Sequence, residues 1–170
     1  MKQNSVFVGI AVILAGALWI YGTYLSTPKK AHRLPAGATS PQGKRVEKTD
    51  AEWRGLLTRK QYAVTRERDT EWPNSSELTH EHRAGLYSCV CCHNPLFSSR
   101  TKFDSGTGWP SFYDPIVVNA IYTEPDGSRT EVRCSVCDAH LGHVFTDGPE
   151  PTGLRFCMNG TALSFTQVSQ

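Results

Sequence analysis

Two Cys-x-x-Cys pairs constrain the fold of this chain more than any other feature. Cys89 and Cys92 form the first pair, and Cys134 and Cys137 form the second. Each pair can place two thiolates on one turn, and two such turns complete a tetrahedron around a zinc ion. Because four thiolates leave no open position for a substrate, such a site is structural, and metal binding adds directly to the free energy of folding. We therefore predict one structural Zn²⁺ that joins two distant loops.

The cysteines also allow other interpretations. A single Cys-x-x-Cys can act as a redox dithiol, and the six cysteines of the chain could instead form disulfides in a secreted protein. Two matching pairs argue against both interpretations. Cys91 lies inside the first pair without ligand spacing to the second, so it is either a spare thiol or a resolving cysteine.

Charge is distributed unevenly along the 170 residues. Residues 1–50 contain seven Lys and Arg against two acidic residues, whereas residues 51–170 contain eleven against fourteen. A mildly acidic globular part argues against nucleic acid as the main partner. The basic N-terminal part suits a position beside a membrane surface.

An apolar segment near the N-terminus predicts a membrane anchor. The residues from Val6 to Leu25 carry no charge, and as a helix they would span about 30 Å, the thickness of the hydrocarbon core. A cleavable signal peptide is the alternative, but its apolar part is shorter, about 7–15 residues, and a small-x-small site should follow it. No such site lies just after Leu25. We therefore predict a retained single-pass anchor over residues 6–25, after a short tail at residues 1–5.

The side of the membrane on which the rest of the chain lies is left open by the charges. Lys29, Lys30 and Arg33 follow the apolar segment, and only Lys2 precedes it. By the positive-inside rule this arrangement favours a cytoplasmic domain. Single N-terminal anchors also deliver domains outward, so both a cytoplasmic and an extracytoplasmic location are compatible with the sequence.

A tether and a folded domain follow the predicted anchor. Residues 26–48 contain several Pro, Gly and basic residues without apolar periodicity, which predicts a flexible tether. We expect one monomeric domain over residues 49–168. Thr49 and Glu52 match a capping box, and apolar residues follow from Trp53 onward at helical spacing. A short helix is therefore expected to open the domain.

Beyond about residue 85, short apolar stretches alternate with Gly, Pro, Asn and Asp, which is typical of β-strands and turns. Asp126-Gly127 lies between two such stretches and predicts a hairpin turn. The stretches assigned to strands are Ile116–Val118, Thr130–Arg133, His143–Phe145 and Ala162–Phe165. The sequence predicts a mainly β domain with antiparallel strands.

Cys157 lies outside the predicted metal set and is the candidate nucleophile. A lone cysteine between apolar residues is most often a small buried hydrophobic residue. Arg155 is close in sequence, however, and His140 and His143 lie upstream. Cationic or proton-sharing neighbours lower the pKa of a thiol and make the thiolate available. The two histidines have other interpretations, as a metal-binding pair or as ordinary surface residues.

A glycine-rich segment from Gly106 to Phe112 is the remaining concentrated motif. Gly106 and Gly108 permit an unusual backbone path, and Pro110 stiffens it. Trp109 is then either an exposed contact for an apolar substrate group or a ring that fills the core beneath a turn.

Together these motifs resemble the type B family of methionine-R-sulfoxide reductases. The resemblance covers about residues 50–167 and leaves the predicted anchor and tether outside. Weaker likeness begins near Trp53 and includes Thr70-Glu71. The motifs that carry the resemblance are Gly85–Cys92, Pro95–Phe97, Lys102–Phe112, Arg129–Val132, Cys134–Cys137, His140–Phe145, Asp147–Pro149 and Pro151–Asn159.

The resemblance implies a fold and a set of residue roles. The fold would be two antiparallel β-sheets with a few peripheral short helices and a four-cysteine zinc site remote from the chemistry. Cys157 would be the nucleophile, and Trp109 would hold the S-methyl group of the substrate. The residues that would bind and protonate the sulfoxide oxygen are His143, with His140, Arg155 and Asn159 nearby. The residues that would help to form the pocket are Phe145 and Phe156.

The resemblance also implies the substrate and the co-reactant. Oxidised proteins or peptides that contain methionine-R-sulfoxide would be repaired after oxidative stress, and Cys157 would become a sulfenic acid in the process. A thioredoxin-like protein or another thiol would then reduce that acid.

This chain departs from the common pattern of that family at two positions. Thr107 stands where many relatives carry the resolving cysteine, so Cys91 is the one remaining candidate for that role. Gly160 replaces a frequent serine, which we expect to loosen the loop after Asn159.

Overall fold

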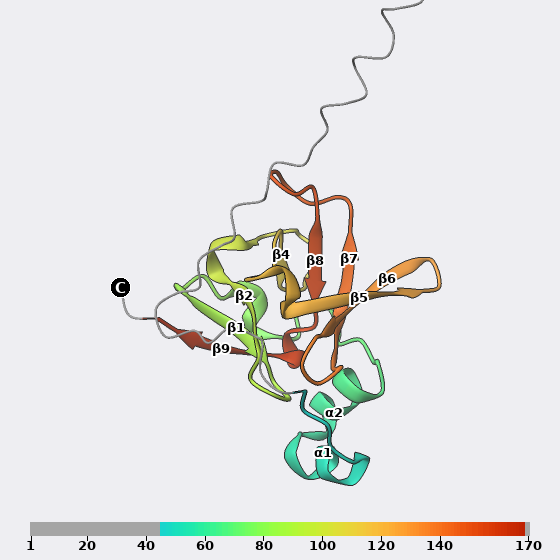
Figure 1. Cartoon of the computed structure of the whole chain (residues 1–170). Helices are drawn as coiled ribbons and strands as arrows, with labels where there is room; N and C mark the ends of the chain where they lie inside the picture. Colours follow the sequence, from blue (N-terminus) through green and yellow to red (C-terminus); the bar gives the residue numbers. More distant parts are fainter. Residues whose placement is uncertain (1–44, 169–170) are drawn as a thin grey trace, which may run out of the picture. The chain divides into compact units, whose positions relative to one another are not determined.

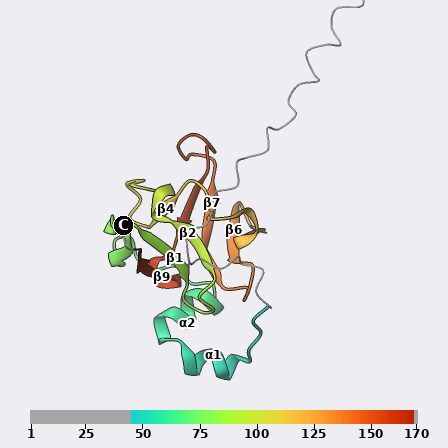
Figure 2. The same cartoon turned by 60° about the vertical axis from the view of Figure 1, so that its left-hand side comes forward.

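The computed structural model describes residues 45–168, which form two antiparallel β-sheets with two short helices at one end (Figures 1 and 2). The smaller sheet has the strand order β2-β1-β9, and the larger has the order β3-β4-β8-β7-β6-β5. The helices are α1 (Asp50–Leu56) and α2 (Arg59–Arg66). The strands are β1 (Gly85–Cys89), β2 (Pro95–Ser98), β3 (Lys102–Phe103), β4 (Ser111–Phe112), β5 (Ile121–Asp126), β6 (Arg129–Cys134), β7 (His140–Phe145), β8 (Arg155–Met158) and β9 (Leu163–Gln167). Single 3₁₀ turns lie at Glu77–His80, Ser99–Thr101, Val118–Ala120 and Gly160–Ala162. The predicted mainly β class with peripheral short helices is confirmed.

Aromatic rings from both sheets meet in the core between them. The ring of Phe112 on β4 stacks on Phe97 of β2, with centroids 4.4 Å apart, and meets the edge of Tyr87 on β1 at 4.9 Å. Phe156 on β8 lies 5.8 Å from Phe97. These rings are almost fully removed from water. Burial of a side chain of this size stabilises the folded state by about 1.5–3 kcal/mol. The core therefore fixes β8 against the smaller sheet.

Both helices begin with a capping box. Thr49 accepts a hydrogen bond from the backbone of Glu52 at the start of α1, as predicted. Thr58 and Gln61 form the same arrangement at the start of α2, a second helix that we did not predict. Trp53 is only 3% exposed, so α1 is held to the domain through its apolar face.

The β5–β6 hairpin confirms the predicted turn. Asp126 pairs with Arg129 across the turn, and Gly127 has φ = 59°, a left-handed conformation that favours glycine. The strands predicted at 130–133 and 143–145 lie within β6 and β7. The strand predicted at 162–165 lies in β9, apart from its first residue.

The strand predicted at Ile116–Val118 is wrong. Ile116 is buried and its backbone N–H donates to the carbonyl of Leu96 (2.8 Å), whereas Val118 is 85% exposed and begins a 3₁₀ turn. The strand starts instead at Ile121, opposite Cys134, the last residue of β6. A short apolar run does not by itself select a strand, because strand pairing needs a partner edge.

The predicted anchor at residues 6–25 lies outside the described residues. Within residues 45–168, no helix has the length and apolar character that crossing a bilayer requires. The last four residues of the predicted tether are described, and there Val46 donates its backbone N–H to the carbonyl of Val136 (2.8 Å).

Candidate active site and metal centre

The two Cys-x-x-Cys segments fold into matching turns. The Cys89 carbonyl accepts a hydrogen bond from the N–H of His93 (2.8 Å), and the Cys134 carbonyl accepts one from Asp138 (3.0 Å). His93 and Asp138, each directly after the second cysteine of its pair, have φ values of 61° and 56°. This left-handed residue turns the chain back, so both thiolates of a pair point to the same side.

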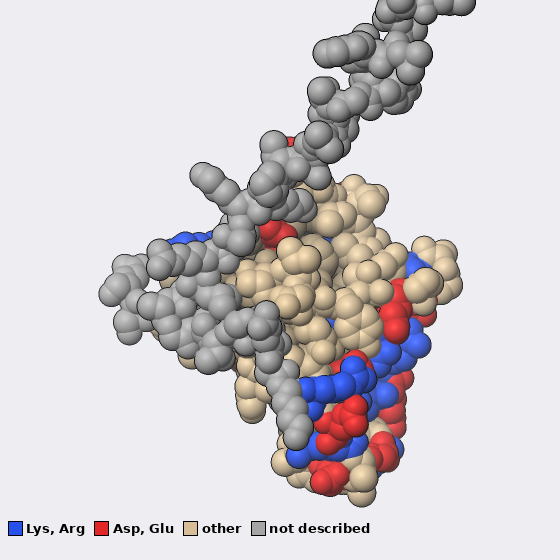
Figure 3. Space-filling model, viewed as in Figure 1, with Lys and Arg blue, Asp and Glu red and all other residues tan. Residues whose placement is uncertain are grey.

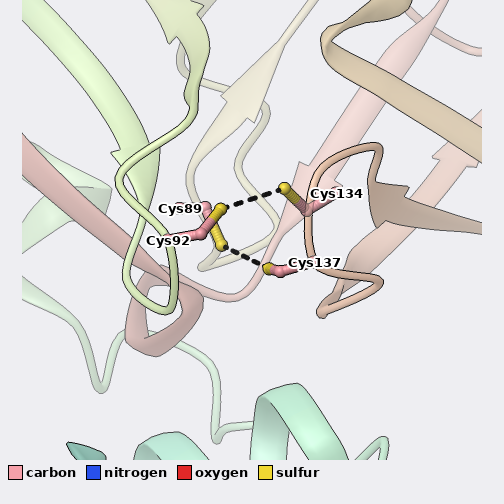
Figure 4. Close-up of side chains that lie close together, drawn as sticks. All are labelled: Cys89, Cys92, Cys134 and Cys137. Carbon is pink, nitrogen blue, oxygen red and sulfur yellow. Dashed lines mark hydrogen bonds between the residues drawn. The ribbon is translucent and has the colours of Figure 1, made fainter. Parts of the chain in front are cut away.

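The four sulfur atoms of these turns lie close together (Figure 4). The distance between the Sγ atoms of Cys89 and Cys137 is 3.7 Å, and that between Cys92 and Cys134 is 3.6 Å. All four ligand atoms lie within 4.8 Å of one another. Zinc–sulfur bonds of about 2.3 Å place the sulfurs of a tetrahedral site about 3.8 Å apart, whereas a disulfide bond measures about 2.05 Å. The four cysteines therefore fit one structural Zn²⁺, as predicted, and do not form disulfides.

Cys157 lies on β8 between β4 and β7. It pairs with Ser111 of β4 on one side and with His143 of β7 on the other. Side chains alternate along a strand, so Phe156 and Met158 face the core while Cys157 faces away from it. A cavity of about 120 Å³ opens on that side. Its lining consists of Thr70, Trp109, Arg129, Gly142, His143, Phe145, Cys157 and Asn159.

A set of bonded hydroxyl groups, those of Ser105, Thr107 and Ser111, lies beside the Cys157 sulfur. The Oγ1 atom of Thr107 lies 4.0 Å from the Sγ atom of Cys157. Ser105 Oγ bonds both Thr107 Oγ1 (2.8 Å) and Ser111 Oγ (2.7 Å). Burial raises the pKa of the Cys157 thiol, while the Arg155 guanidinium and the Thr107 hydroxyl act in the opposite direction. The resting group is therefore mainly a thiol at neutral pH, and a charge or hydrogen bond at the sulfur favours its ionisation.

Trp109 is held by the main chain of a distant segment. Its Nε1–H donates to the carbonyl oxygen of Glu71 (3.2 Å), and the N–H of Glu71 donates to Oδ1 of Asn159 (3.1 Å). Asn159 in turn donates from Nδ2 to the carbonyl of Leu141 (3.2 Å). The backbone of Glu71 thus links two residues on the wall of the cavity.

The carboxylate of Glu71 anchors the turn that follows the nucleophile. Oε1 accepts the N–H of Gly160 (2.6 Å), and Oε2 accepts the N–H of Thr161 (2.9 Å) as well as its hydroxyl. Glu71 is only 5% exposed. A Cβ atom on Gly160 would lie 2.1 Å from Oγ of Ser76. The expected loosening of this loop is therefore wrong, because Ser76 occupies the space beside Gly160 and Glu71 holds its backbone.

Replacement of Glu71 by alanine is expected to lower the free energy of unfolding by about 3 kcal/mol, because it leaves the buried N–H of Gly160 and the partly buried N–H of Thr161 without an acceptor. Chemical denaturation monitored by circular dichroism measures this change. Glu77→Ala is the matched control, since Glu77 is exposed and is expected to change stability by less than about 0.5 kcal/mol. Equal midpoints for both variants would contradict the anchoring role of Glu71.

Two histidine–carboxylate pairs lie on one side of the cavity. His143 Nε2 is 2.8 Å from Asp126 Oδ2, and His140 Nδ1 is 2.6 Å from Glu131 Oε1. Arg68 contacts both acids, at 3.3 Å from Asp126 and 2.6 Å from Glu131. The hydrogen bond from His143 lowers the pKa of Asp126, so this carboxylate is ionised. Burial lowers the pKa of His140, although Glu131 opposes the effect.

Arg155 is held by Asp147 beside the nucleophile. Its Nε and Nη2 atoms donate to the two oxygens of Asp147 at 2.8 and 2.9 Å. Its guanidinium carbon lies 4.3 Å from the centroid of the Phe145 ring. Arg155 is two residues before Cys157 on the same face of β8, so the bidentate pair fixes a positive charge near the thiol.

Comparison with known proteins gives the family. Residues 57–167 match the family model described as the SelR domain. The chain belongs to the SelR family. Proteins called peptide methionine sulfoxide reductase MsrB are similar over 71% of this chain. That of Pseudomonas putida strain W619 is 54% identical, and 94% of its length is covered. Those of Herminiimonas arsenicoxydans and Hahella chejuensis are 52% and 54% identical, with 91% and 90% of their lengths covered.

The structure brings together most of the site residues expected of a SelR protein. Trp109, His143, Phe145, Cys157 and Asn159 line one cavity. The other predicted site residues, which are Arg155, His140, Phe156 and Cys91, do not line it. Arg155 lies beside it, as described above.

His140 and Phe156 lie deeper than a direct substrate contact requires. The His140 ring is 2% exposed and packs edge-on against His143, with centroids 5.4 Å apart. Its Nε2 atom is buried without a hydrogen-bond partner among the described residues. Phe156 points into the core, because it alternates with Cys157 along β8. These two residues support the cavity from behind.

Cys91 lies in the first metal-binding turn, and the residues that line the Cys157 cavity do not include it. Thr107, the residue at the position where the resemblance led us to expect a resolving cysteine, lies next to the Cys157 sulfur. A hydroxyl therefore occupies a position from which a thiol could reach the nucleophile.

Sequence reasoning missed three acidic residues of the site. Glu71, Asp126 and Asp147 hold Trp109, His143 and Arg155 in place. Glu71 and Asp147 belong to segments that carry the family resemblance, Thr70-Glu71 and Asp147-Gly148-Pro149, and that membership could have marked them as site residues. Asp126 gave no such signal beyond its place in a hairpin turn.

Proposed function

We infer that this chain reduces methionine-R-sulfoxide in proteins to methionine, with Cys157 as the nucleophile. The observation that carries the proposal is the convergence of a thiol, an imidazole and an indole, those of Cys157, His143 and Trp109, on one small cavity. The metal-binding cysteines belong to a separate set, so the zinc ion would support the fold and supply no step of the reaction.

The first step transfers oxygen from the substrate sulfur to Cys157. A sulfoxide sulfur is a weak electrophile until its oxygen accepts a hydrogen bond or a proton. Asp126 accepts a hydrogen bond from Nε2 of His143, so the imidazolium form of His143 would donate from Nδ1 to the sulfoxide oxygen. The Cys157 thiolate attacks the substrate sulfur and forms a transient sulfur–sulfur bond while the sulfoxide oxygen takes a proton from His143. The protonated oxygen then moves to Sγ of Cys157 as its bond to the substrate sulfur and the sulfur–sulfur bond break, so the products are methionine and the sulfenic acid of Cys157.

The epimer is selected by three contacts with a chiral sulfur. The indole of Trp109 would receive the methyl group, His143 the oxygen, and Cys157 the open side of the sulfur. Because Trp109 is fixed through Glu71, exchange of the methyl group and the oxygen would place the oxygen against the indole. This arrangement supports preference for one epimer, and similarity to the MsrB proteins supports the R epimer.

The sulfenic acid is then reduced by thiols from outside the cavity. One external thiol displaces water to form a mixed disulfide with Cys157, and a second thiol releases the Cys157 thiol and leaves as a disulfide. Thioredoxin or a small thiol can supply both. The hydroxyl of Thr107 beside Cys157 and the position of Cys91 in the metal-binding turn support this direct route.

The experiment that tests the proposal is an epimer-resolved assay of the full chain. The protein is mixed with dithiothreitol and a peptide that contains either methionine-R-sulfoxide or methionine-S-sulfoxide, and the methionine product is quantified by chromatography. We expect turnover of the R peptide and none of the S peptide. Reduction of neither peptide would leave a binding module as the function.

We further propose that residues 6–25 anchor the enzyme in a membrane as a single helix. The support is the uncharged apolar run from Val6 to Leu25 and the basic residues that follow it. After expression of the full chain, carbonate extraction is expected to leave the protein in the membrane pellet with its N-terminus intact. A soluble product that begins after residue 25 would show cleavage of a signal peptide instead.

A further inference from the structure

An exposed tryptophan lies beside the cavity without a role in the chemistry described above. Trp72 is 83% exposed and has neither a hydrogen bond through its side chain nor a ring contact within residues 45–168. The other large apolar side chains exposed in that part of the chain are Leu56 and Val118. Neither of these two is near a cavity residue in the sequence, whereas Trp72 is two residues from Thr70, which lines the cavity.

The backbone around Trp72 is fixed to the segment that carries Trp109. The N–H of Asn74 donates to the carbonyl of Gly108 (2.7 Å), and Glu71 accepts the Trp109 indole N–H (3.2 Å). A further bond closes the turn after Trp72, from the N–H of Ser75 to the Trp72 carbonyl (3.2 Å). The chain therefore presents the Trp72 indole to solvent from a rigid main chain on both sides.

Trp72 is exposed and adjoins Glu71, the buried residue that holds Trp109 in the cavity wall. Thr70 and Trp72 are exposed, while Glu71 between them is buried. Glu71 points inward to Gly160 and its carbonyl holds Trp109, so its exposed neighbours Thr70 and Trp72 project to solvent from the segment that supports the cavity.

The cavity has room for the oxidised side chain alone. At about 120 Å³ it leaves the main chain of the substrate outside, over the exposed residues of the mouth, Thr70 and Arg129. A peptide that crosses there in an extended conformation places the side chain two residues from the oxidised methionine about 7 Å from it on the same side. Trp72 adjoins this path through the chain, two residues after Thr70 at the mouth and directly after Glu71, which holds Trp109.

We propose that Trp72 binds an apolar side chain flanking the oxidised methionine in an extended polypeptide substrate. This inference rests on the proposed function and specifies its substrate: segments in which the oxidised methionine has apolar neighbours, as in the hydrophobic cores of partly unfolded proteins. A rigid, amphipathic indole is well suited to such a contact, because little side-chain entropy is lost when it is covered. Tryptophan is also among the residues that most often dominate a binding interface.

The test compares three substrates with the full chain: N-acetyl-methionine-R-sulfoxide, a methionine-R-sulfoxide peptide flanked by glycines, and one flanked by leucines. The measured quantity is kcat/KM for each peptide divided by kcat/KM for the N-acetyl compound. For the wild type we expect the leucine peptide to exceed the glycine peptide by about five- to thirtyfold, the range of one interface tryptophan. Trp72→Ala is expected to bring the two peptides to within about twofold of each other, mainly through KM.

Two further variants separate docking from a structural effect. Trp72→Phe is expected to keep most of the preference for leucine, and Val118→Ala, which removes an exposed apolar side chain elsewhere, is expected to keep all of it. A leucine preference that persists in Trp72→Ala would overturn the proposal. So would an equal loss for all three substrates, because it would mean that Trp72 acts on the cavity through its backbone. Failure of the wild type to reduce any of the three substrates would instead overturn the proposed function itself and, with it, this inference.

Discussion

Replacement of Cys134 by serine is expected to abolish zinc binding and to unfold the domain or lower its thermal midpoint by at least about 10 °C. Cys134 is buried, and its Sγ atom lies 3.6 Å from that of Cys92 on a turn far away in the sequence. A structural zinc site contributes about 10–16 kcal/mol of apparent binding energy, whereas the whole domain is stable by only about 5–15 kcal/mol. Even a partial loss of about 3 kcal/mol corresponds to a shift of about 10 °C in a domain of this size.

The contribution of zinc to stability can also be measured on the wild type, by metal analysis combined with thermal unfolding. The purified chain is expected to contain one zinc ion, and a strong chelator should release it with a parallel loss of circular dichroism. Cys91→Ser is the matched control, because Cys91 lies within the first turn but outside the four-sulfur cluster. This variant should keep its zinc and its midpoint. A domain that remains folded and metal-free at the wild-type midpoint would contradict a structural role for the four cysteines.

The four-cysteine site was predictable because its signal is local. Each Cys-x-x-Cys turn is determined by neighbouring residues, and only the meeting of the two turns needs the tertiary fold. The same holds for the capping box at Thr49 and the hairpin at Gly127, where side-chain type and backbone conformation are linked over four residues. The strand predicted at 116–118 failed, because whether an apolar run pairs with a neighbour is decided by the sheet and not by the run.

The sequence was sufficient to predict the central residues of the candidate site but not the residues that hold them in place. Cys157, His143 and Trp109 stand in recognisable motifs, and the structure brings all three to one cavity. Which side of a strand faces the cavity depends on register, which is why Phe156 faces the core although it is adjacent to the nucleophile. The hydrogen-bond partners of these residues come from distant segments, as Asp126 does for His143, and no local sequence pattern predicts such a contact.

Replacement of Cys157 by serine is expected to lower the rate of methionine-R-sulfoxide reduction by at least about 10³-fold. A serine hydroxyl is a far weaker nucleophile than a thiolate and cannot form the sulfenic acid. The loss of the nucleophile removes the chemical step itself, so the whole rate falls rather than the affinity for substrate. A single-turnover assay with the R peptide and excess enzyme reports this step directly, since no reductant is needed for the first methionine to be released.

The controls separate the nucleophile from the metal site and from a resolving thiol. Cys157→Ser should keep its zinc and its thermal midpoint, because Cys157 is not one of the four clustered cysteines. Cys91→Ser should retain turnover with both dithiothreitol and thioredoxin, since Thr107 is the residue beside the Cys157 sulfur. Loss of thioredoxin-dependent turnover alone in Cys91→Ser would instead make Cys91 the resolving thiol. Single-turnover release of methionine by Cys157→Ser at the wild-type rate would show that another group attacks the sulfoxide, and the assignment of the cavity as the active site would fail with it.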